Sequence, residues 1–294
     1  MSTGIVVVVR PDDVESTSDA LWSLGTQAIE ERWLSVGLVE LWTELGEDRR
    51  AIEIALRSLP ADRVWRFVDV DESVADEWRR HARPHRVSPG LVIVPEWFDQ
   101  NGVEPWSSGT KLVRIEPGPT FGLGDHPTTS GCLASIESHV RPGDTVLDVG
   151  CGSGVLGIAA LVSGASRAHG TDLMPAAVRV STDNATRNGV ADRWSVSTEP
   201  LDVVGRAFDV VVANILLPVL VELAPQLVRL AGRILIVSGV LDGTEGRLIE
   251  ALAPLVEVDR VTVSGWTTVV LSDPRQVPSS ASISTRVGND GTAP

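Results

Sequence analysis

A regular alternation of apolar, strand-like segments and amphipathic, helix-like segments from Thr145 onward is the feature that most limits the fold. Strands that are joined through helices lie parallel in one sheet, with helices on both of its faces. The last two strands are joined by a short turn and are expected to pair antiparallel. The sequence thus predicts an α/β domain with a doubly wound, Rossmann-like sheet of seven strands. The segments are strands 145–149, 168–172, 194–197, 208–213, 233–237, 256–263 and 267–271 and helices 155–162, 175–188, 218–230 and 246–255.

The region before this alternation has a different pattern. It favours a small α+β unit of ferredoxin-like arrangement, in which two helices pack on one mainly antiparallel sheet. The predicted elements are strands 5–9, 37–42 and 64–70 and helices 19–31 and 49–59.

The composition of two further stretches sets the expected domain limits. Gly, Pro, Ser and Asn concentrate between residues 99 and 109, as in a loop that connects domains. Beyond Asp273 the chain has no apolar periodicity, which is typical of disorder. We therefore expect an N-terminal domain at 1–98, a linker at 99–110, a second domain at 111–275 and a disordered tail at 276–294.

A glycine-rich segment follows the first strand of the alternation. Gly150, Gly152 and Gly154 lie between an apolar strand and an apolar helix, where a backbone without Cβ atoms can approach a ligand closely. A dinucleotide-binding fingerprint would need its third glycine at Val155. The spacing therefore favours S-adenosylmethionine over a nicotinamide dinucleotide as the cofactor.

Two acidic residues support an adenosine-containing cofactor. Asp148 precedes the glycines, and the positive charges of S-adenosylmethionine tolerate a nearby carboxylate better than the phosphates of a dinucleotide do. Asp172 ends the second strand and is expected to accept hydrogen bonds from both ribose hydroxyls. An NAD-dependent oxidoreductase would use such an Asp in the same way and is a second interpretation. A binding module that keeps the cofactor fold without catalysis is a third.

Four segments together resemble one known family. They are residues 121–129 (FGLGDHPTT), 146–154 (VLDVGCGSG), 183–189 (DNATRNG) and 211–216 (VVANIL). Through them the chain from about residue 78 to residue 273 is similar to the ribosomal protein L11 methyltransferase family, PrmA. The resemblance implies a class I methyltransferase domain preceded by a substrate-recognition domain on a flexible linker. It also implies methyl transfer to amino groups, of lysine side chains or the N-terminal α-amine, of a large-subunit ribosomal protein.

The same segments supply the expected site residues. Asn214 is the candidate catalytic residue, because its carbonyl can accept from an amine N–H and so point the nitrogen lone pair at a methyl group. By the resemblance, Phe121 and Gly122 form a lid over the cofactor. Thr128 and Thr129 are expected to bind its methionine end or to cap the following helix. The expected cofactor-binding residues are Phe121, Gly122, Thr128, Thr129, Asp148, Gly150, Gly152, Gly154, Asp172 and Asn214.

Three further observations concern the acceptor and the pocket. His126 precedes a proline at a helix start and is either a general base or a hydrogen-bonded structural residue. Residues 199–201 are the expected wall of an adenine pocket. The segment 215–217 lacks the aromatic side chain on which a flipped nucleobase would stack. An aliphatic amine is therefore favoured over a nucleobase, and a small molecule or another protein stays open as the acceptor.

The formal charge of −14 bears on the partners. It opposes binding to free nucleic acid and to anionic membranes, and it favours either a basic protein partner or simple solubility. Cys132 and Cys151 have no companions at metal-ligand or redox spacing, so neither a metal site nor a disulfide is expected. The first residues resemble neither a signal peptide nor a membrane helix. We therefore expect a cytoplasmic, monomeric protein that binds a basic ribosomal protein.

Overall fold

Two units, each with a hydrophobic core of its own, make up the chain: Met1–Ala82 and Arg83–Pro294. The boundary lies before the predicted one at residue 98, because strands β5 (His85–Ser88) and β6 (Leu91–Pro95) pair within the second unit. The computed structural model describes residues 3–24, 26, 29–34, 37–44, 49–57, 59, 63–69, 82–98, 106–118, 120, 122, 124–277 and 283–287.

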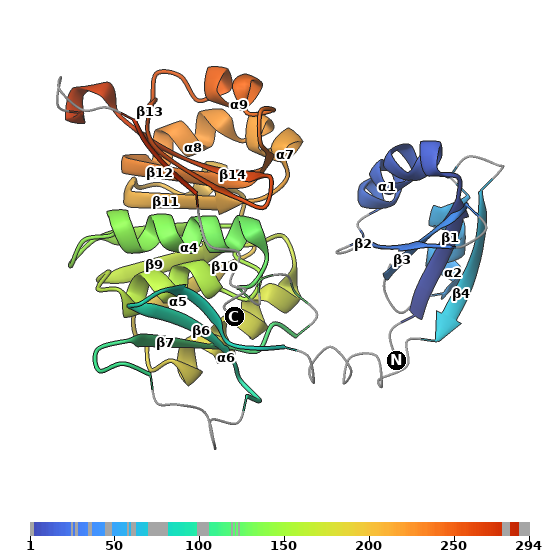
Figure 1. Cartoon of the computed structure of the whole chain (residues 1–294), viewed down its shortest axis with the longest axis horizontal. Coiled ribbons are helices and arrows are strands. Elements are labelled where there is room, and N and C mark those ends of the chain that lie inside the picture. The colour runs from blue at the N-terminus through green and yellow to red at the C-terminus, as the bar shows by residue number, and fades with distance from the viewer. Residues whose placement is uncertain are drawn as a thin grey trace. The chain divides into compact units, whose positions relative to one another are not determined.

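The first unit is a four-stranded antiparallel sheet with two helices, drawn in blue in Figure 1. Its strands lie in the order β2-β3-β1-β4. Alternate residues of β1, such as Ile5 and Val7, enter a core with Leu21 and Ile52 of the helices. The elements are β1 (Thr3–Val9), a 3-10 turn (Pro11–Asp13), α1 (Val14–Ser23), β2 (Ile29–Trp33), β3 (Val39–Glu44), α2 (Arg49–Leu56) and β4 (Val64–Asp69).

One prediction for this unit is wrong. The pattern predicts a helix over 19–31, but α1 ends at Ser23 and residues 29–31 belong to β2. β2 pairs with β3 along its whole length, from Ile29 opposite Thr43 to Trp33 opposite Val39. Pairing between strands outweighs the local helical periodicity here, because β structure depends on cross-strand neighbours that a local pattern does not contain.

The second unit contains a mixed sheet of eight strands among the described residues, in the order β10-β9-β8-β11-β12-β14-β13-β15. The first five run parallel, and β14 is antiparallel to both β12 and β13. The predicted doubly wound sheet with a terminal hairpin is therefore present. Its strands are β8 (Thr145–Val149), β9 (Arg167–Thr171), β10 (Trp194–Ser197), β11 (Phe208–Asn214), β12 (Ala231–Leu241), β13 (Val256–Val263), β14 (Trp266–Ser272) and β15 (Ser284–Val287).

Helices cover both faces of this sheet. The helix predicted over 218–230 is two helices, because Pro225 lies in the first turn of the second and cannot continue the hydrogen bonding of the first. The helix predicted over 246–255 ends at Ala251, before Pro254. One face carries α4 (Pro127–His139), α5 (Val155–Val162) and α6 (Pro175–Arg187), and the other carries α7 (Leu217–Glu222), α8 (Ala224–Leu230) and α9 (Gly246–Ala251).

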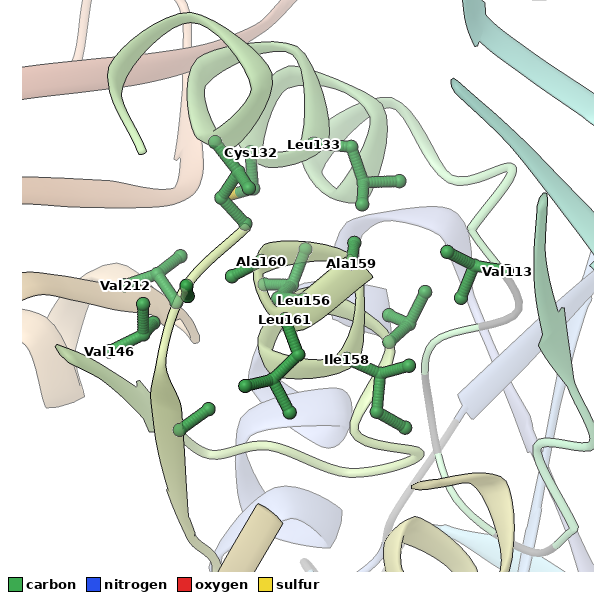
Figure 2. Close-up of a cluster of buried hydrophobic side chains, with 14 of the residues drawn as sticks. Val113, Cys132, Leu133, Val146, Leu156, Ile158, Ala159, Ala160, Leu161 and Val212 are labelled. Carbon is green, nitrogen blue, oxygen red and sulfur yellow. The ribbon is translucent and has the colours of Figure 1, made fainter. Parts of the chain in front are cut away.

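A small sheet, β5-β6-β7, packs on the outer side of α4, α5 and α6. Its third strand, β7 (Lys111–Ile115), runs parallel to β6, so residues 99–110 lie between two strands of one sheet and not between two domains as predicted. Val113 of this sheet shares one buried core with Leu133 of α4 and Ile158 of α5 (Figure 2). This packing holds the two helices whose first turns carry the site described below.

Residues 284–287 lie inside the stretch predicted to be disordered, yet they form β15 beside β13. Arg286 of this strand pairs with Asp259, and its guanidinium donates to Ser138 Oγ at 2.8 Å. Four residues are too few to show a period, so only the long-range pairing reveals this strand. None of the helices in the described ranges is long and apolar enough to cross a lipid bilayer.

Candidate active site

The carboxyl ends of the parallel strands bring the predicted site residues together. β8 lies between β9 and β11, and its last residue, Val149, is opposite Thr171 and Ala213. The residues that follow these three strands therefore lie together at the carboxyl ends of the strands, where open α/β sheets bind their ligands. That end of the sheet holds the glycine segment after β8, Asp172 after β9 and Asn214 at the end of β11.

The glycine segment has a backbone conformation that other residues rarely adopt. Gly150 has a φ of 69° and Gly154 a φ of 80°. A Cβ atom on Gly150 would lie 2.5 Å from Cγ2 of Ile215, and one on Gly154 would lie 2.8 Å from Cβ of Ser181. The N–H of Gly150 donates to the carbonyl of Thr171 at 2.8 Å. The segment is thus a tight turn fixed against the neighbouring strand and without room for side chains at these two positions.

Asp148 places a carboxylate inside the protein just before this turn. Its side chain is almost wholly buried, and Oδ2 accepts a 2.9 Å hydrogen bond from the N–H of Gly157 in α5. Oδ1 is also buried, and no described residue hydrogen-bonds to it. Burial raises the pKa of Asp148 to about 7, and the bond from Gly157 acts in the opposite direction. Such an oxygen would be stabilised by a bound group that is cationic or donates a hydrogen bond.

Asp172 closes the turn from the end of β9. Its Oδ2 accepts from the N–H of Gly152 at 2.9 Å, and its Oδ1 accepts from the N–H of Met174 at 2.9 Å. A carboxylate oxygen has a second lone pair, so both oxygens can accept a further hydrogen bond. The side chain therefore has the capacity that the predicted contact with a ribose diol requires.

An apolar surface beside Asp172 was not predicted from the sequence. Leu173 is 83% exposed, directly after the carboxylate. Leu201, which the sequence analysis assigned to the adenine pocket, is 6% exposed and belongs to the core beneath α7 and α8. Burial in this core leaves Leu201 little free surface for a ligand, whereas the exposed side chain of Leu173 lies directly after Asp172.

The first turn of α4 reaches the end of β11. Thr129 is 1% exposed, and its Oγ1 accepts a 3.2 Å hydrogen bond from Nδ2 of Asn214. Upstream, the carbonyl of Gly122 accepts from Ser153 Oγ at 2.6 Å, which ties this stretch to the glycine segment. Phe121, the other predicted lid residue, lies outside the described residues. The structure therefore joins Gly122 and Thr129 to the site.

His126 is the N-cap of α4, a role that the sequence analysis gave to a threonine. Its Nδ1 accepts from the N–H of Thr128 and lies 2.7 Å from Thr128 Oγ1. Its ring makes an edge contact with Trp266 of β14, with centroids 5.5 Å apart. Burial lowers the pKa of His126, although Asp125 acts to raise it. These contacts give His126 a structural function at the start of α4.

A second histidine supports the same helix from behind. His85 of β5 is 6% exposed, and its Nε2 lies 2.7 Å from Oγ of Ser130, which follows Thr129. Ser130 Oγ is also within 3.4 Å of the carbonyl of Gly124. Burial lowers the pKa of His85, with Asp125 acting in the opposite direction. The sequence gave no indication of this contact, because 45 positions separate the two residues.

Comparison with known proteins places these features in a family. Residues 64–273 match the family model described as ribosomal protein L11 methyltransferase (PrmA). The chain belongs to the ribosomal protein L11 methyltransferase family. A protein of that name from Azotobacter vinelandii is 37% identical over 292 residues, with 89% of this chain and 96% of the relative covered. Another from Pseudomonas paraeruginosa is 34% identical, with 88% and 94% covered. The crystal structure of a ribosomal protein L11 methylase from Lactobacillus delbrueckii subsp. bulgaricus matches with a TM-score of 0.60 and 31% identity, over 65% of this chain and 99% of that one.

Membership in the L11 methyltransferase family confirms S-adenosylmethionine as the cofactor and excludes the oxidoreductase interpretation. The residues present fit this molecule. The unpartnered oxygen of Asp148 suits the positive charges of S-adenosylmethionine, and Asp172 can accept hydrogen bonds from the ribose hydroxyls of the cofactor. The turn at Gly150 and Gly154 packs closely against Ile215 and Ser181 and holds the segment between β8 and α5 at the carboxyl end of the sheet. In this family member, Asp148, Gly150, Gly152, Gly154 and Asp172 would hold the cofactor, with Gly122 and Thr129 beside them.

Proposed function

We propose that this chain transfers methyl groups to amino groups of ribosomal protein L11, either lysine side chains or the N-terminal α-amine. The observation that carries the proposal is the position of Asn214. Its amide nitrogen is engaged by Thr129, so the carbonyl oxygen is the atom that can accept from an amine. The adjacent Ile215 touches the glycine turn, so acceptor and cofactor would meet there.

The chemistry needs an unprotonated amine in line with the methyl group. S-adenosylmethionine, when bound, supplies a methyl group on a sulfonium centre. A lysine amine has an unperturbed pKa of about 10.4 and must lose its proton first, which an apolar environment favours. Ile215 and Trp266 provide apolar surface close to Asn214 and His126. Asn214 then accepts from an amine N–H and holds the lone pair in the reactive direction.

The absence of an aromatic side chain in Ile215-Leu216-Leu217 supports an aliphatic amine over a nucleobase. Methylation of another protein or of a small molecule is the alternative, because the fold does not select the acceptor.

We also propose that the first unit is a ferredoxin-like domain that recognises the acceptor. Its strand order is β2-β3-β1-β4, with α1 connecting β1 to β2 and α2 connecting β3 to β4, and this topology supports the fold assignment. Residues 1–82 contain 17 acidic and 9 basic side chains, which favours a basic partner such as a ribosomal protein over free nucleic acid. We further propose that the protein is a monomer that works in the cytoplasm; the free, buried state of Cys132 and Cys151 supports a reducing compartment.

The test is methylation of purified L11 from the same host by the full chain, followed by mass spectrometry of the product. Asn214→Ala is expected to lower kcat by about 10²- to 10³-fold, because the amine is no longer oriented. The affinity for S-adenosylmethionine, measured by titration calorimetry, should change by less than about threefold. Asn214→Asp keeps a carbonyl acceptor and should retain more turnover than the alanine variant. Unchanged turnover in Asn214→Ala would exclude the catalytic role, and the absence of any mass shift on L11 would exclude L11 as the acceptor.

A further inference from the structure

Large apolar side chains remain exposed after Asn214 and at the end of β12. Leu216 is 47% exposed, Val219 is 40% exposed and Leu241 is 52% exposed. Single exposed apolar residues are ordinary, but a group at one edge of a sheet next to a reactive position indicates an interaction surface. We call these three residues the acceptor-side patch.

The three side chains belong to one locality. Leu216 is the N-cap of α7 and Val219 lies three residues further, in the first turn of the helix. α7 packs on β12, the strand that ends at Leu241. The backbone of Gly239 in β12 approaches the carbonyl of Ile215 so closely that a Cβ would collide with it. The loop after Asn214 therefore lies directly against the end of β12.

The patch also continues to the reactive position. Leu241 pairs with Trp266 across β12 and β14. Trp266 in turn contacts His126 at the start of α4, where Thr129 binds Asn214. An acceptor that presents an amine to Asn214 would consequently rest its flanking residues on this patch.

Burial in the core does not account for the exposed residues. Leu220 of α7 is 0% exposed and Leu217 packs beside it, so the inner side of the helix already has its apolar contacts. The patch is flanked by exposed acidic residues. Glu222 lies three residues, about one helical turn, after Val219, and Asp242 comes directly after Leu241. An apolar centre with an acidic rim suits a basic protein segment that has aliphatic side chains near its target amine.

We propose that Leu216, Val219 and Leu241 form a docking surface for the segment of the protein acceptor that surrounds the methylated amine. This proposal rests on the proposed function, because it assumes that the acceptor is a basic protein. It assigns recognition of the acceptor in part to the second unit, beside the catalytic position.

The test compares lysine substitutions in the patch with a matched control. Val219→Lys and Leu241→Lys should each raise the KM for L11 by about tenfold or more, and should weaken equilibrium binding of L11 to a similar extent, because each removes apolar surface and repels a basic segment. Free lysine has no flanking residues to rest on the patch, so any methylation of it should change by less than about twofold. Val256→Lys is the control, because Val256 is 38% exposed at the start of β13, level with the first residues of β12 at the opposite end of that strand. It adds the same charge and should leave both reactions unchanged.

Four results would decide between the possibilities, with circular dichroism and melting curves to establish that each full-length variant is folded. Equal KM and binding constants for Val219→Lys, Leu241→Lys and Val256→Lys would overturn the docking surface. Loss of a wild-type dimer in the patch variants, with unchanged KM for L11, would assign the patch to a second copy of the chain and would also overturn it. Patch-dependent binding of L11 without any methylation would refute the proposed function but keep the surface. Methylation of L11 that is insensitive to the patch substitutions would keep the proposed function but refute the docking surface.

Discussion

The glycine turn and the segment after Asn214 border the same edge of the sheet, but they are built from different kinds of contact. On the cofactor side the polar groups are held by backbone: Asp172 accepts from two main-chain N–H groups, and Asp148 accepts from one inside the core. On the acceptor side the surface consists of side chains such as Leu216 and Leu241, which are about half exposed. The cofactor side therefore leaves little freedom to the sequence, whereas the acceptor side can change residue by residue.

This difference has a physical reason. Backbone contacts to a constant cofactor require particular φ angles and the absence of Cβ atoms, so few sequences satisfy them. Apolar contacts to a protein require only area of the right shape and are easily exchanged. Substitutions on the two sides should therefore have separable effects, on cofactor affinity in one case and on the KM for the acceptor in the other.

The largest effect is expected at Gly150. A Cβ in Gly150→Ala would lie 2.5 Å from Ile215, on a backbone with a φ of 69°. We expect the affinity for S-adenosylmethionine to fall by at least about tenfold and the free energy of unfolding by about 1 to 3 kcal/mol, measured by calorimetry and urea denaturation. Gly143→Ala is the matched control, because Gly143 has a φ of 92° but no atom within 4 Å of the added Cβ. Equal losses in both variants would show that the collision is unimportant.

A smaller effect is expected for Asp148→Asn, on the free energy of unfolding, and this effect depends on pH. The folded-state pKa of about 7 is above the ordinary value of 3.8, so the folded protein binds the proton more tightly than the unfolded chain does. The stability contributed by this group is present at low pH and is lost as the pH rises toward 7. Asp148→Asn has no such titration, so its free energy of unfolding relative to the wild type should increase by about 1 to 3 kcal/mol between pH 5 and pH 8.

Urea denaturation at a series of pH values measures this difference. Any constant cost of the substitution cancels, because only the slope with pH is compared. A difference between variant and wild type that does not change with pH would contradict the raised pKa of Asp148.

Removing His85 or Ser130 is expected to lower the affinity for the cofactor less than Gly150→Ala does. Removing either partner breaks the 2.7 Å contact behind α4, at a cost of about 1 to 2 kcal/mol in the free energy of unfolding. His85→Ala and Ser130→Ala should each weaken cofactor binding by about two- to fivefold, because the start of α4 shifts. In a double-mutant cycle the two effects should be clearly less than additive. Full additivity would mean that the two residues act separately.

The smallest effect is expected far from both sides of the site, at Arg286. Its contacts with Asp259 and Ser138 attach β15 to the sheet. Arg286→Ala should lower the free energy of unfolding by about 1 kcal/mol or less, without a change in cofactor affinity or in the KM for L11. Arg275→Ala, in a pair whose arginine side chain is 87% exposed, should cost still less. A change in cofactor affinity in Arg286→Ala would show that the tail acts on the site.

Helices and strands with clear local patterns have the predicted limits, whereas strands that depend on distant pairing do not. Strands 145–149, 194–197 and 256–263 and helix 155–162 have the predicted limits, because buried strands and a helix between glycines leave clear local patterns. β2 and β15 were missed, since each is short and depends on pairing with a distant strand. The division of the predicted helix at Pro225 could have been foreseen from the proline itself.

The sequence by itself determined the type of sheet and the glycine turn, and it favoured S-adenosylmethionine as the cofactor. These depend on periodicity and on glycine and acidic residues within a short stretch, from Asp148 to Asp172. Only the tertiary structure brought Thr129 to Asn214, His85 to Ser130 and Gly239 to the loop after Asn214. Those contacts join residues far apart in the chain, and their free energy depends on how the sheets and helices pack, which no local pattern records.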